Sequence, residues 1–280
     1  MPHVVILVYE GTGFEGRRYT LDHIADFWRR DGIKVTVLSG VDRFVEADLA
    51  ILHVDLTVVP GEYARFARRY PVALNLGATD ISKRRISTHL VRPGDGYDGP
   101  VIVKTDRNHG GQQEAWLASR GRRARRWVNA LRDRLPWTCR ARLASAEYPV
   151  FDSVRQVPGM VWHNRSLVVE RFLPERDGEW YCLRMWTVLG DRETNTRCYS
   201  RQPIVKSANI DHREPVDEVP DELRDMRREL SLDYAKFDYA LVDGRAVLYD
   251  VNPTPSLGST TREQVAPRHE HLAQGLHAYL

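Results

Sequence analysis

Two aspartates and one asparagine near the C-terminal end have residue types and a spacing that suit a small metal site. Asp238 lies in one apolar segment, Asp250 and Asn252 lie in the next, and Asp243-Gly244 separates the two segments. An Asp-Gly pair closes tight hairpins, so we expect the segments to pair as neighbouring strands. Residues 250 and 252 then point to the same face, and an aspartate within an apolar strand needs a partner. Two carboxylates and an amide oxygen predict a site for Mg²⁺, with Mn²⁺ as a second option; the alternative for Asn252 is a turn former.

One lysine stands out because lysine is scarce in this chain. Only five of the 41 basic residues are lysines, so arginine is the routine surface cation. Lys104 ends an apolar segment, and Gly110 and Gly111 follow after a short loop. A compact ammonium can reach a phosphate as a point charge, and glycine N–H groups can surround its oxygens. We therefore predict that Lys104, Gly110 and Gly111 bind the phosphates of a nucleotide, while His109 contacts phosphate or solvent rather than acting as an acid or base.

A third segment has the pattern expected of an adenine-binding strand. Residues 167–173 are apolar except for Glu170 and Arg171, and they lie between two structured regions. The backbone of such a strand can offer N–H and C=O groups to the edge of a base. We expect Glu170, Arg171 and Phe172 to lie at the adenine. Glu175 and Glu179 compete for the ribose hydroxyls, and we favour Glu179.

These three segments, in this order and at these separations, resemble the ATP-grasp superfamily, whose metal motif reads acid…acid-x-Asn near the C-terminal end. The similarity covers roughly residues 80 to 260. Residues 181–209 are similar to the branch that ligates amino acids to peptides or proteins. The resemblance implies that Arg184 and Arg201 contact the transferred phosphate and that Lys83, at the end of the first domain, binds the nucleotide as a further cofactor-binding residue. The second metal acid is usually glutamate in the family, whereas here it is Asp250.

The resemblance also implies an enzyme, an ATP-dependent carboxylate–amine (or carboxylate–nucleophile) ligase that releases ADP and phosphate. The γ-phosphoryl group of ATP would pass to a carboxylate while magnesium and basic side chains stabilise the developing charge. The acyl phosphate would then meet a nucleophile held close by. The expected partners are a small-molecule or peptide carboxylate and an amine or other nucleophile. The alternatives are a small-molecule kinase, an RNA-modifying ligase and a non-catalytic nucleotide-binding regulator.

The first third of the chain alternates apolar runs with helical patterns, which predicts an α/β layer on a mainly parallel sheet. The glycine spacing of residues 11–16 does not fit a dinucleotide fingerprint. Family members place substrate groups after the first strand, which makes Tyr9, Glu10 and Arg17 weak candidates. The expected strands are residues 4–9, 34–38, 50–54 and 72–75, and the expected helices are residues 20–31, with Thr20 as N-cap, and 60–69.

The turn-rich residues 92–100 mark the best domain boundary. We expect a Rossmann-like N-terminal α/β substrate domain over 1–90, a middle ATP-grasp subdomain over 91–172, and an α+β C-terminal ATP-grasp subdomain with the metal site over 173–280. The middle subdomain should be enlarged by one or two arginine-rich helices within 112–143, with Trp116, Trp127 and Leu131 as an apolar stripe. Further elements are expected as strands at 101–104, 167–173, 180–189, 196–205, 237–242 and 246–251, with a turn near Asp191, and as helices at 221–230, with Asp221 as N-cap, and 263–279.

Composition sets wider limits. Hydrophobic residues make up 42% and charged residues 28% of the 280, which is typical of a globular protein. No run reaches the ~18 apolar residues of a membrane span, and the first residues have no signal-peptide pattern. Three widely spaced cysteines suit a reducing cytoplasm. The net charge of +3 does not favour nucleic acid as a partner, so the arginine-rich segment is interpreted as a solvated face. The oligomeric state is left open, with a homodimer as one option.

Overall fold

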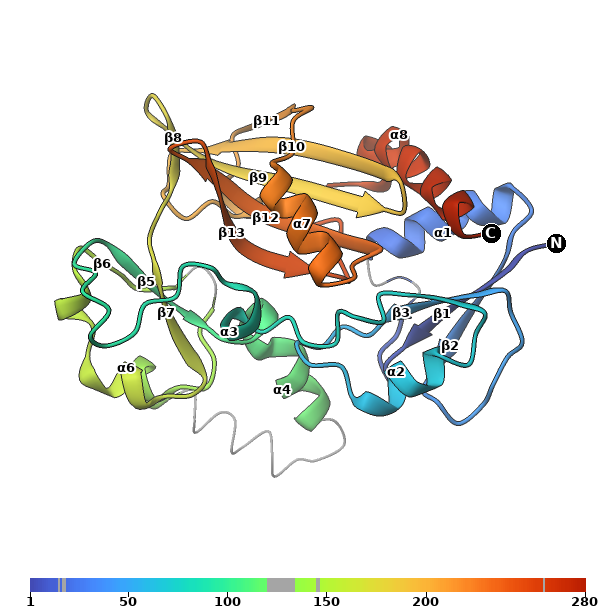
Figure 1. Cartoon of the computed structure of the whole chain (residues 1–280), viewed down its shortest axis with the longest axis horizontal. Helices are drawn as coiled ribbons and strands as arrows, with labels where there is room; N and C mark the ends of the chain where they lie inside the picture. The colour runs from blue at the N-terminus through green and yellow to red at the C-terminus, as the bar shows by residue number, and fades with distance from the viewer. Residues whose placement is uncertain (15, 17–18, 120–133, 145–146, 259) are drawn as a thin grey trace.

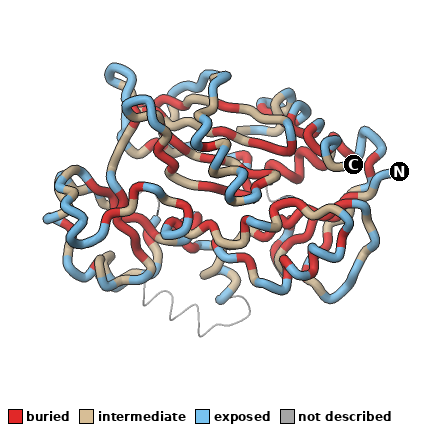
Figure 2. Tube along the Cα trace, in the orientation of Figure 1, coloured by how far each residue is buried: buried red, intermediate tan, exposed pale blue. Residues whose placement is uncertain are grey.

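The computed structural model describes residues 1–14, 16, 19–119, 134–144, 147–258 and 260–280. Three β-sheets organise the described residues. Figure 1 shows the small sheet of the middle region and the N-terminal sheet toward opposite ends of the long axis, with the large C-terminal sheet alongside them. Figure 2 shows that buried residues follow the strands of all three sheets. Within the described ranges, no helix combines the length and apolar character that a membrane crossing requires.

The N-terminal sheet has four parallel strands in the order β2-β1-β3-β4. The strands are β1 (His3–Val8), β2 (Lys34–Ser39), β3 (Leu49–His53) and β4 (Val72–Leu74). Successive side chains of a strand point to opposite faces, and β1 accordingly sends Val4 and Ile6 into one apolar cluster and Val5 and Leu7 into another. A parallel sheet buried on both faces explains why β1 is apolar at nearly every position.

A helix covers each face of this sheet. Helix α1 (Thr20–Arg30) contributes Leu21, Ile24 and Trp28 to the first cluster, and α2 (Gly61–Ala67) contributes Tyr63 and Phe66 to the second. The expectation that Thr20 is the N-cap of the first helix is wrong. Tyr19 occupies that position, and the backbone N–H of Thr20 donates to the carbonyl of Pro255 instead.

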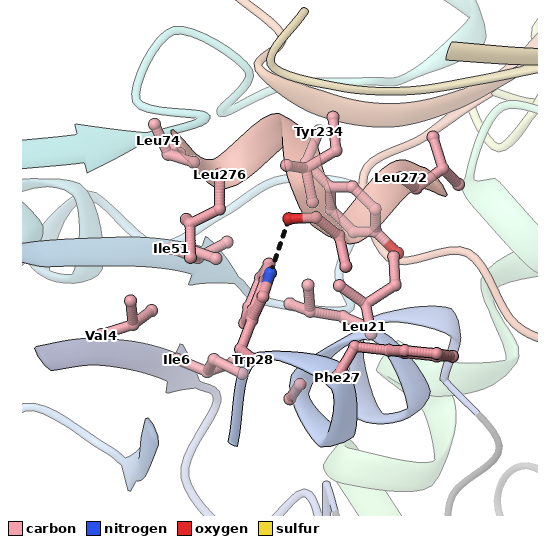
Figure 3. Close-up of a cluster of buried hydrophobic side chains, with 14 of the residues drawn as sticks. Val4, Ile6, Leu21, Phe27, Trp28, Ile51, Leu74, Tyr234, Leu272 and Leu276 are labelled. Atoms are coloured by element: carbon pink, nitrogen blue, oxygen red, sulfur yellow. Dashed lines mark hydrogen bonds between the residues drawn. The ribbon is translucent and has the colours of Figure 1, made fainter. Parts of the chain in front are cut away.

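The first and last parts of the chain share one core, drawn in Figure 3. Leu272 and Leu276 pack with Trp28, whose indole N–H donates to the carbonyl of Ala273 at 2.8 Å. The expected helix over 263–279 is present as α8 (Arg262–Ala273), which is followed by a 3-10 helix, η5 (Gln274–Tyr279). A Cβ at Gly275 would lie 1.9 Å from the carbonyl oxygen of Leu189, so this close packing requires glycine.

The middle region forms a three-stranded antiparallel sheet in the order β6-β5-β7. Its strands are β5 (Val101–Thr105), β6 (Val150–Phe151) and β7 (Leu167–Arg171), so the strand expected over 167–173 ends two residues early. Before β5 lies α3 (Lys83–Ile86), and between β6 and β7 lie η3 (Val154–Gln156) and α6 (Gly159–His163). The core of this region gathers Val101, Val103, Val161, Leu167 and Val169.

Of the arginine-rich helices expected within 112–143, the described residues confirm only a helix over 112–119, which contains no arginine. Helix α4 (Gln112–Ser119) follows the 3-10 turn η1 (Asn108–Gly111), but none of its residues is buried and Trp116 is 40% exposed. The expected apolar stripe is therefore absent from α4, and Trp127 and Leu131 lie outside the described residues. Residues 134–143 hold only η2 (Trp137–Cys139), because Pro136 has no N–H to continue an α-helix. The helical expectation is wrong there.

The large C-terminal sheet is antiparallel, in the order β11-β10-β9-β12-β13, with β8 paired to β9. The expected turn near Asp191 is confirmed, although β10 begins at Arg192 rather than at residue 196. The hairpin at Asp243-Gly244 is also confirmed, and both residues have the positive φ that a tight primed turn requires. The strands are β8 (Glu175–Asp177), β9 (Trp180–Leu189), β10 (Arg192–Ser200), β11 (His212–Pro215), β12 (Tyr234–Val242) and β13 (Arg245–Asn252).

Helix α7 (Asp221–Glu229) packs against the large sheet through Leu223, which is buried with Phe237 and Val251. The expected helix over 221–230 is thus present, but Pro220 rather than Asp221 is its N-cap residue. A further 3-10 turn, η4 (Ser207–Asn209), lies between β10 and β11.

Candidate functional site

A cavity of about 500 Å³ lies between the small sheet and the large sheet. Four of the five lysines of the chain line it: Lys83, Lys104, Lys206 and Lys236. The predicted metal ligands Asp238, Asp250 and Asn252 line the same cavity. Segments that are far apart in the sequence, from α3, β5, η4, β12 and β13, thus meet at one place.

The two carboxylates lie opposite each other on the β12–β13 hairpin. Asp238 pairs in register with Asp250, and the register shifts directly after Asp238. Each carboxylate has a lysine partner. Nζ of Lys236 lies 2.8 Å from Oδ2 of Asp238, and Nζ of Lys83 lies 3.3 Å from Oδ1 of Asp250. Oδ1 of Asp238 is buried and has no hydrogen-bond partner within the described ranges.

This donor set fits a hard divalent cation. The described residues contain no group of three His, Cys, Asp or Glu side chains that could hold a metal ion by themselves. Two carboxylates and the amide of Asn252 leave positions for phosphate oxygens and water, which is how proteins usually bind Mg²⁺. The buried, unpartnered Oδ1 of Asp238 is the atom that such a cation would satisfy.

Burial and charge act in opposite directions on these groups. Burial favours neutral Asp250, but Lys83, His109, Lys236 and Lys206 together hold its pKa below the ordinary value. Burial also opposes the charge of Lys83 and Lys236, yet their carboxylate partners raise the pKa of both above the ordinary value. All three groups are therefore charged at neutral pH.

Lys104 is fixed from behind by a buried carboxylate. Its Nζ lies 2.7 Å from Oε2 of Glu170, whose side chain is 0% exposed, and Nε2 of His89 lies 3.4 Å from the same oxygen. Burial alone would raise the pKa of Glu170, but Lys104 and His89 hold it well below the usual range. The ammonium of Lys104 also lies 5.1 Å from the ring centroid of Tyr249. Glu170 thus lies behind the cavity wall, and its predicted contact with adenine stays a prediction.

Lys206 differs from the other lysines of the cavity. Among the described residues it has no ion-pair partner, and its Nζ lies 5.8 Å from the ring centroid of Tyr148. Burial and then the charge of Lys104 lower its pKa below the ordinary value. A half-buried cation without a carboxylate partner carries a desolvation cost that a bound anion would offset. Lys206 and Lys236 are not among the site residues predicted from the sequence, although the scarcity of lysine that singles out Lys104 applies to them equally.

Part of the cavity lining is apolar, with Ile102, Phe172, Leu183 and Ile204 among its residues. Arg171, predicted with Phe172 to contact adenine, also lines the cavity. The backbone N–H groups of Arg171 and Phe172 donate to carbonyls of the chain itself, at 3.0 and 2.8 Å. Contact with a base from these two residues would therefore use side chains or carbonyl groups.

The glycine loop reaches the cavity through His109. His109 lines the cavity, and its Nε2 lies 3.2 Å from Nδ2 of Asn252. Gly110 and Gly111 adopt positive φ but do not contribute to the lining of the cavity. A Cβ at Gly110 would lie 2.5 Å from the carbonyl oxygen of Leu143, so close backbone packing accounts for glycine there. Their phosphate contacts stay predictions.

The two predicted catalytic arginines and the two candidate ribose acids pair with each other outside the cavity lining. Arg184 contacts both carboxylate oxygens of Glu175, at 2.9 to 3.1 Å, and the backbone N–H of Leu241 donates to the same carboxylate at 2.8 Å. Arg201 forms an ion pair with Glu179, and both side chains are more than half exposed. Their roles at the nucleotide stay predictions, and Glu175 has its acceptor capacity used by Arg184 and Leu241.

The weak substrate candidates after β1 are only partly placed. Tyr9 stacks on Tyr63 with ring centroids 5.3 Å apart, and the backbone N–H of Glu10 donates to the hydroxyl of Tyr63. Arg17 lies outside the described residues. None of the described members of this group lines the cavity.

Comparisons with known proteins give a result at the level of the fold. No protein-family model matches the chain, and no curated protein matches it in sequence. Among solved structures, the chain is similar to a D-alanine–D-alanine ligase from Bacillus anthracis complexed with ATP, with 11% identity and a TM-score of 0.50 over 100% of this chain and 96% of that chain. It is also similar to a RimK domain protein, described as ATP-grasp, from Sphaerobacter thermophilus, with 10% identity and a TM-score of 0.50 over 98% of each chain. The chain therefore has the ATP-grasp fold over essentially its whole length.

Proposed function

We propose that this chain is an ATP-dependent ligase that joins a carboxylate to an amine or another nucleophile and releases ADP and phosphate. The observation that carries the proposal is the gathering of four of five lysines and two carboxylates on one cavity. Arginine supplies 36 of the 41 basic residues, so four lysines around a single cavity indicate that the cavity requires the compact charge of an ammonium group.

The charge of the cavity suits a metal-bound polyphosphate. Its lining carries four lysines and Arg171 against the carboxylates of Asp238 and Asp250, so cations are in excess. A triphosphate brings several negative charges, and a divalent cation would neutralise part of them between the two aspartates. The volume of about 500 Å³ lies within the usual range of small-ligand pockets.

Asp238, Asp250 and Asn252 would hold Mg²⁺ or Mn²⁺, which supplies positive charge to phosphate oxygens when bound. Lys83 and Lys236, which line the same cavity, already form ion pairs with the two carboxylates. Each carboxylate is therefore held by an ion pair before any cation arrives. Such preorganisation reduces the cost of binding.

The remaining groups divide the nucleotide between them. Lys104, held by Glu170, would contact phosphate oxygens at a fixed position. Lys206, which has no carboxylate partner within the described ranges, would stabilise the charge that develops on the transferred phosphoryl group. We assign this role to Lys206 in preference to Arg184 and Arg201, because those arginines pair with glutamates away from the cavity lining. The apolar part of the lining, with Phe172, would receive the base.

The reaction then follows from positioning. A carboxylate placed beside the terminal phosphate accepts the phosphoryl group, and the acyl phosphate formed reacts with a nucleophile held next to it. The similar solved structures support the ligase reading over a kinase, because one of them is a D-alanine–D-alanine ligase complexed with ATP.

We also propose the division of the chain into residues 1–90, 91–172 and 173–280, with the first as a Rossmann-like substrate domain. The four-stranded parallel sheet falls within the first range, the small sheet within the second and the large sheet within the third. The mostly exposed residues 92–100 separate α3 from β5 and support the first boundary.

A product assay with a screen of carboxylates and amines tests the proposed function. ADP and phosphate that form only when both substrates are supplied would support ligation. ADP without free phosphate would instead indicate a kinase, and ATP binding without any ADP would indicate a regulator. Formation of AMP and pyrophosphate would refute the proposal. Lys206→Ala should lose turnover, while Lys34→Ala, which changes the one lysine outside the cavity, should keep it.

A further inference from the structure

The amide of Asn252 is oriented at both of its ends. Its Oδ1 accepts the backbone N–H of Thr254 at 2.9 Å, and its Nδ2 lies 3.2 Å from Nε2 of His109. Because a backbone N–H can only donate, this bond identifies the amide oxygen. Asn252 and Thr254 are both buried, at 4% and 3% exposure. One lone pair of Oδ1 is thus used by the chain, and one remains.

The hydroxyl of Thr254 has a choice between two acceptors. Its Oγ1 lies 3.0 Å from Oδ1 of Asp55 and 3.1 Å from Oδ1 of Asn252. A hydroxyl has one proton to donate, and a carboxylate accepts it more strongly than a neutral amide oxygen does. The proton therefore goes to Asp55. The other carboxylate oxygen of Asp55 accepts the hydroxyl proton of Tyr19 at 2.8 Å.

The loop after β13 is held against the start of α1, which fixes the distances from Thr254 to Asp55 and Asn252. The backbone N–H of Thr20 donates to the carbonyl of Pro255 at 2.8 Å, and Tyr19 forms a β-bridge with Ser256. Asp55 itself follows β3, at the carboxyl end of the parallel sheet. Two parts of the chain nearly two hundred residues apart thus meet at the hydroxyl of Thr254.

We infer that Asp55 acts as a positioning residue for the metal site, because it draws the Thr254 proton away from Asn252 and so leaves the second lone pair of Oδ1 open to a divalent cation. The inference rests on the proposed function, in which Asn252 is a ligand of that cation. Without Asp55, the Thr254 hydroxyl would turn to Asn252 and occupy that lone pair. The N-terminal sheet would in this way control the ligand strength of a residue on the C-terminal hairpin.

Binding of Mn²⁺ in the presence of a non-hydrolysable ATP analogue, followed by electron paramagnetic resonance, tests the inference without any turnover. Asp55→Ala should weaken Mn²⁺ binding by about 10- to 100-fold, as changes behind a metal ligand usually do. Thr254→Val alone should change the affinity for Mn²⁺ by no more than about twofold, which is the usual deviation from additivity between distant substitutions. The double variant should return to within about twofold of the wild type, because the competing hydroxyl is gone. Tyr19→Phe, which removes the other donor to Asp55, is the matched control and should bind as the wild type does.

The outcomes separate the two proposals. A wild-type chain that binds no Mn²⁺ with the nucleotide would overturn the proposed function and this inference with it. If the wild type binds and Asp55→Ala binds as tightly, the inference alone is overturned. It is overturned as well if the double variant stays as weak as Asp55→Ala, since loss of structure alone gives no rescue. Should Asp55→Ala fail to fold by circular dichroism, Asp55→Leu keeps the side-chain size without an acceptor and carries the same comparison with Thr254→Val.

Discussion

The ion pair between Lys104 and Glu170 gives the most direct test of how the cavity is built. The structure places Glu170 behind Lys104 with 0% exposure, as the group that fixes the lysine. The sequence pattern instead predicts that Glu170 lies at adenine. Glu170→Gln separates these roles, because it keeps the shape of the side chain and removes its charge.

The expected effect follows from the geometry of the pair. At 2.7 Å and an effective dielectric of about 20, two unit charges attract by about 6 kcal/mol, part of which only offsets their desolvation. Removing one partner of a buried pair typically costs about 3–5 kcal/mol. The side chain of Lys104 is 10% exposed and lines a cavity, so we take the lower end, about 3 kcal/mol. In a chain of this size each kcal/mol lowers Tm by about 2–4 °C, which gives a decrease of roughly 6–12 °C.

Thermal unfolding at two pH values is the assay. The pKa of Glu170 is held below its usual value of 4.5, so its contribution is complete above that pH and is lost as the pH falls toward the folded pKa. The difference between wild type and Glu170→Gln should therefore be full at pH 7 and smaller by about 1 kcal/mol at pH 4. The double variant Lys104→Met/Glu170→Leu should recover most of the stability while losing affinity for ATP.

The opposite pattern would refute this reasoning. If Glu170→Gln keeps the wild-type Tm at pH 7 but binds ATP weakly, Glu170 contacts the nucleotide and does not support Lys104. A decrease in Tm that is the same at both pH values would show that the loss is not electrostatic. A double variant less stable than Glu170→Gln would show that the pair is not the source of the cost.

Three further predictions concern Lys206, Asp238 and the contact between Glu114 of α4 and Thr57. Lys206→Ala should weaken ATP binding by about 10- to 100-fold, as expected for a lost charged contact. Burial and the charge of Lys104 lower the pKa of Lys206 below 10.5, so calorimetry on the wild type should show ATP affinity decreasing at a lower pH than for an ordinary lysine, and Lys206→Arg should move that decrease to higher pH. Asp238→Asn should raise the Mg²⁺ concentration needed for half-maximal ATP binding by at least about 10- to 100-fold, the loss of affinity that substitution of a residue behind a metal ligand already causes. Titration of Mg²⁺ at fixed ATP measures it, and an unchanged Mg²⁺ dependence would contradict the metal site. Glu114 accepts the N–H and the hydroxyl of Thr57 at 3.0 and 2.6 Å, so Glu114→Ala should speed hydrogen exchange in α4 by about 10-fold or more and leave exchange in β12 as it is.

Much of the architecture could be predicted from local pattern. Apolar runs and turn residues were enough for the hairpin at Asp243-Gly244 and for the position of Lys104 at the end of β5. A hairpin sets its own register, and the register of the Asp243-Gly244 turn alone would place Tyr249 opposite Asp238. The shift directly after Asp238 brings Asp250 there instead, and the local pattern does not show that shift. The scarcity of lysine singles out Lys104 in the sequence, and the same criterion holds for Lys83, Lys206 and Lys236, which line the same cavity.

The contacts of Glu170 and Glu175 were not predicted, because they depend on how distant strands pair, which no local sequence pattern shows. Strand β7 is buried on both faces up to Glu170, so alternation of polar and apolar residues could not show which way Glu170 points. Arg184 lies opposite Arg197 in the register of β9 and β10, and both contact Glu175 from β8. This cluster exists only once three strands have paired. The sequence around Arg184 or Glu175 alone therefore does not show that these two residues pair with each other rather than with a ligand.

Arginine and lysine bind carboxylates with different geometries in this structure. Arg184 meets Glu175 with two nitrogens of its planar fork, an arrangement that uses both carboxylate oxygens and leaves little for a ligand. Lys83 contacts a single oxygen of Asp250, so the same carboxylate can serve a lysine and a cation at once. In the proposed metal site, a lysine beside a carboxylate therefore leaves an oxygen for a cation, whereas a bidentate arginine would not. That requirement accounts for Lys83 and Lys236, two of the four lysines that line the cavity.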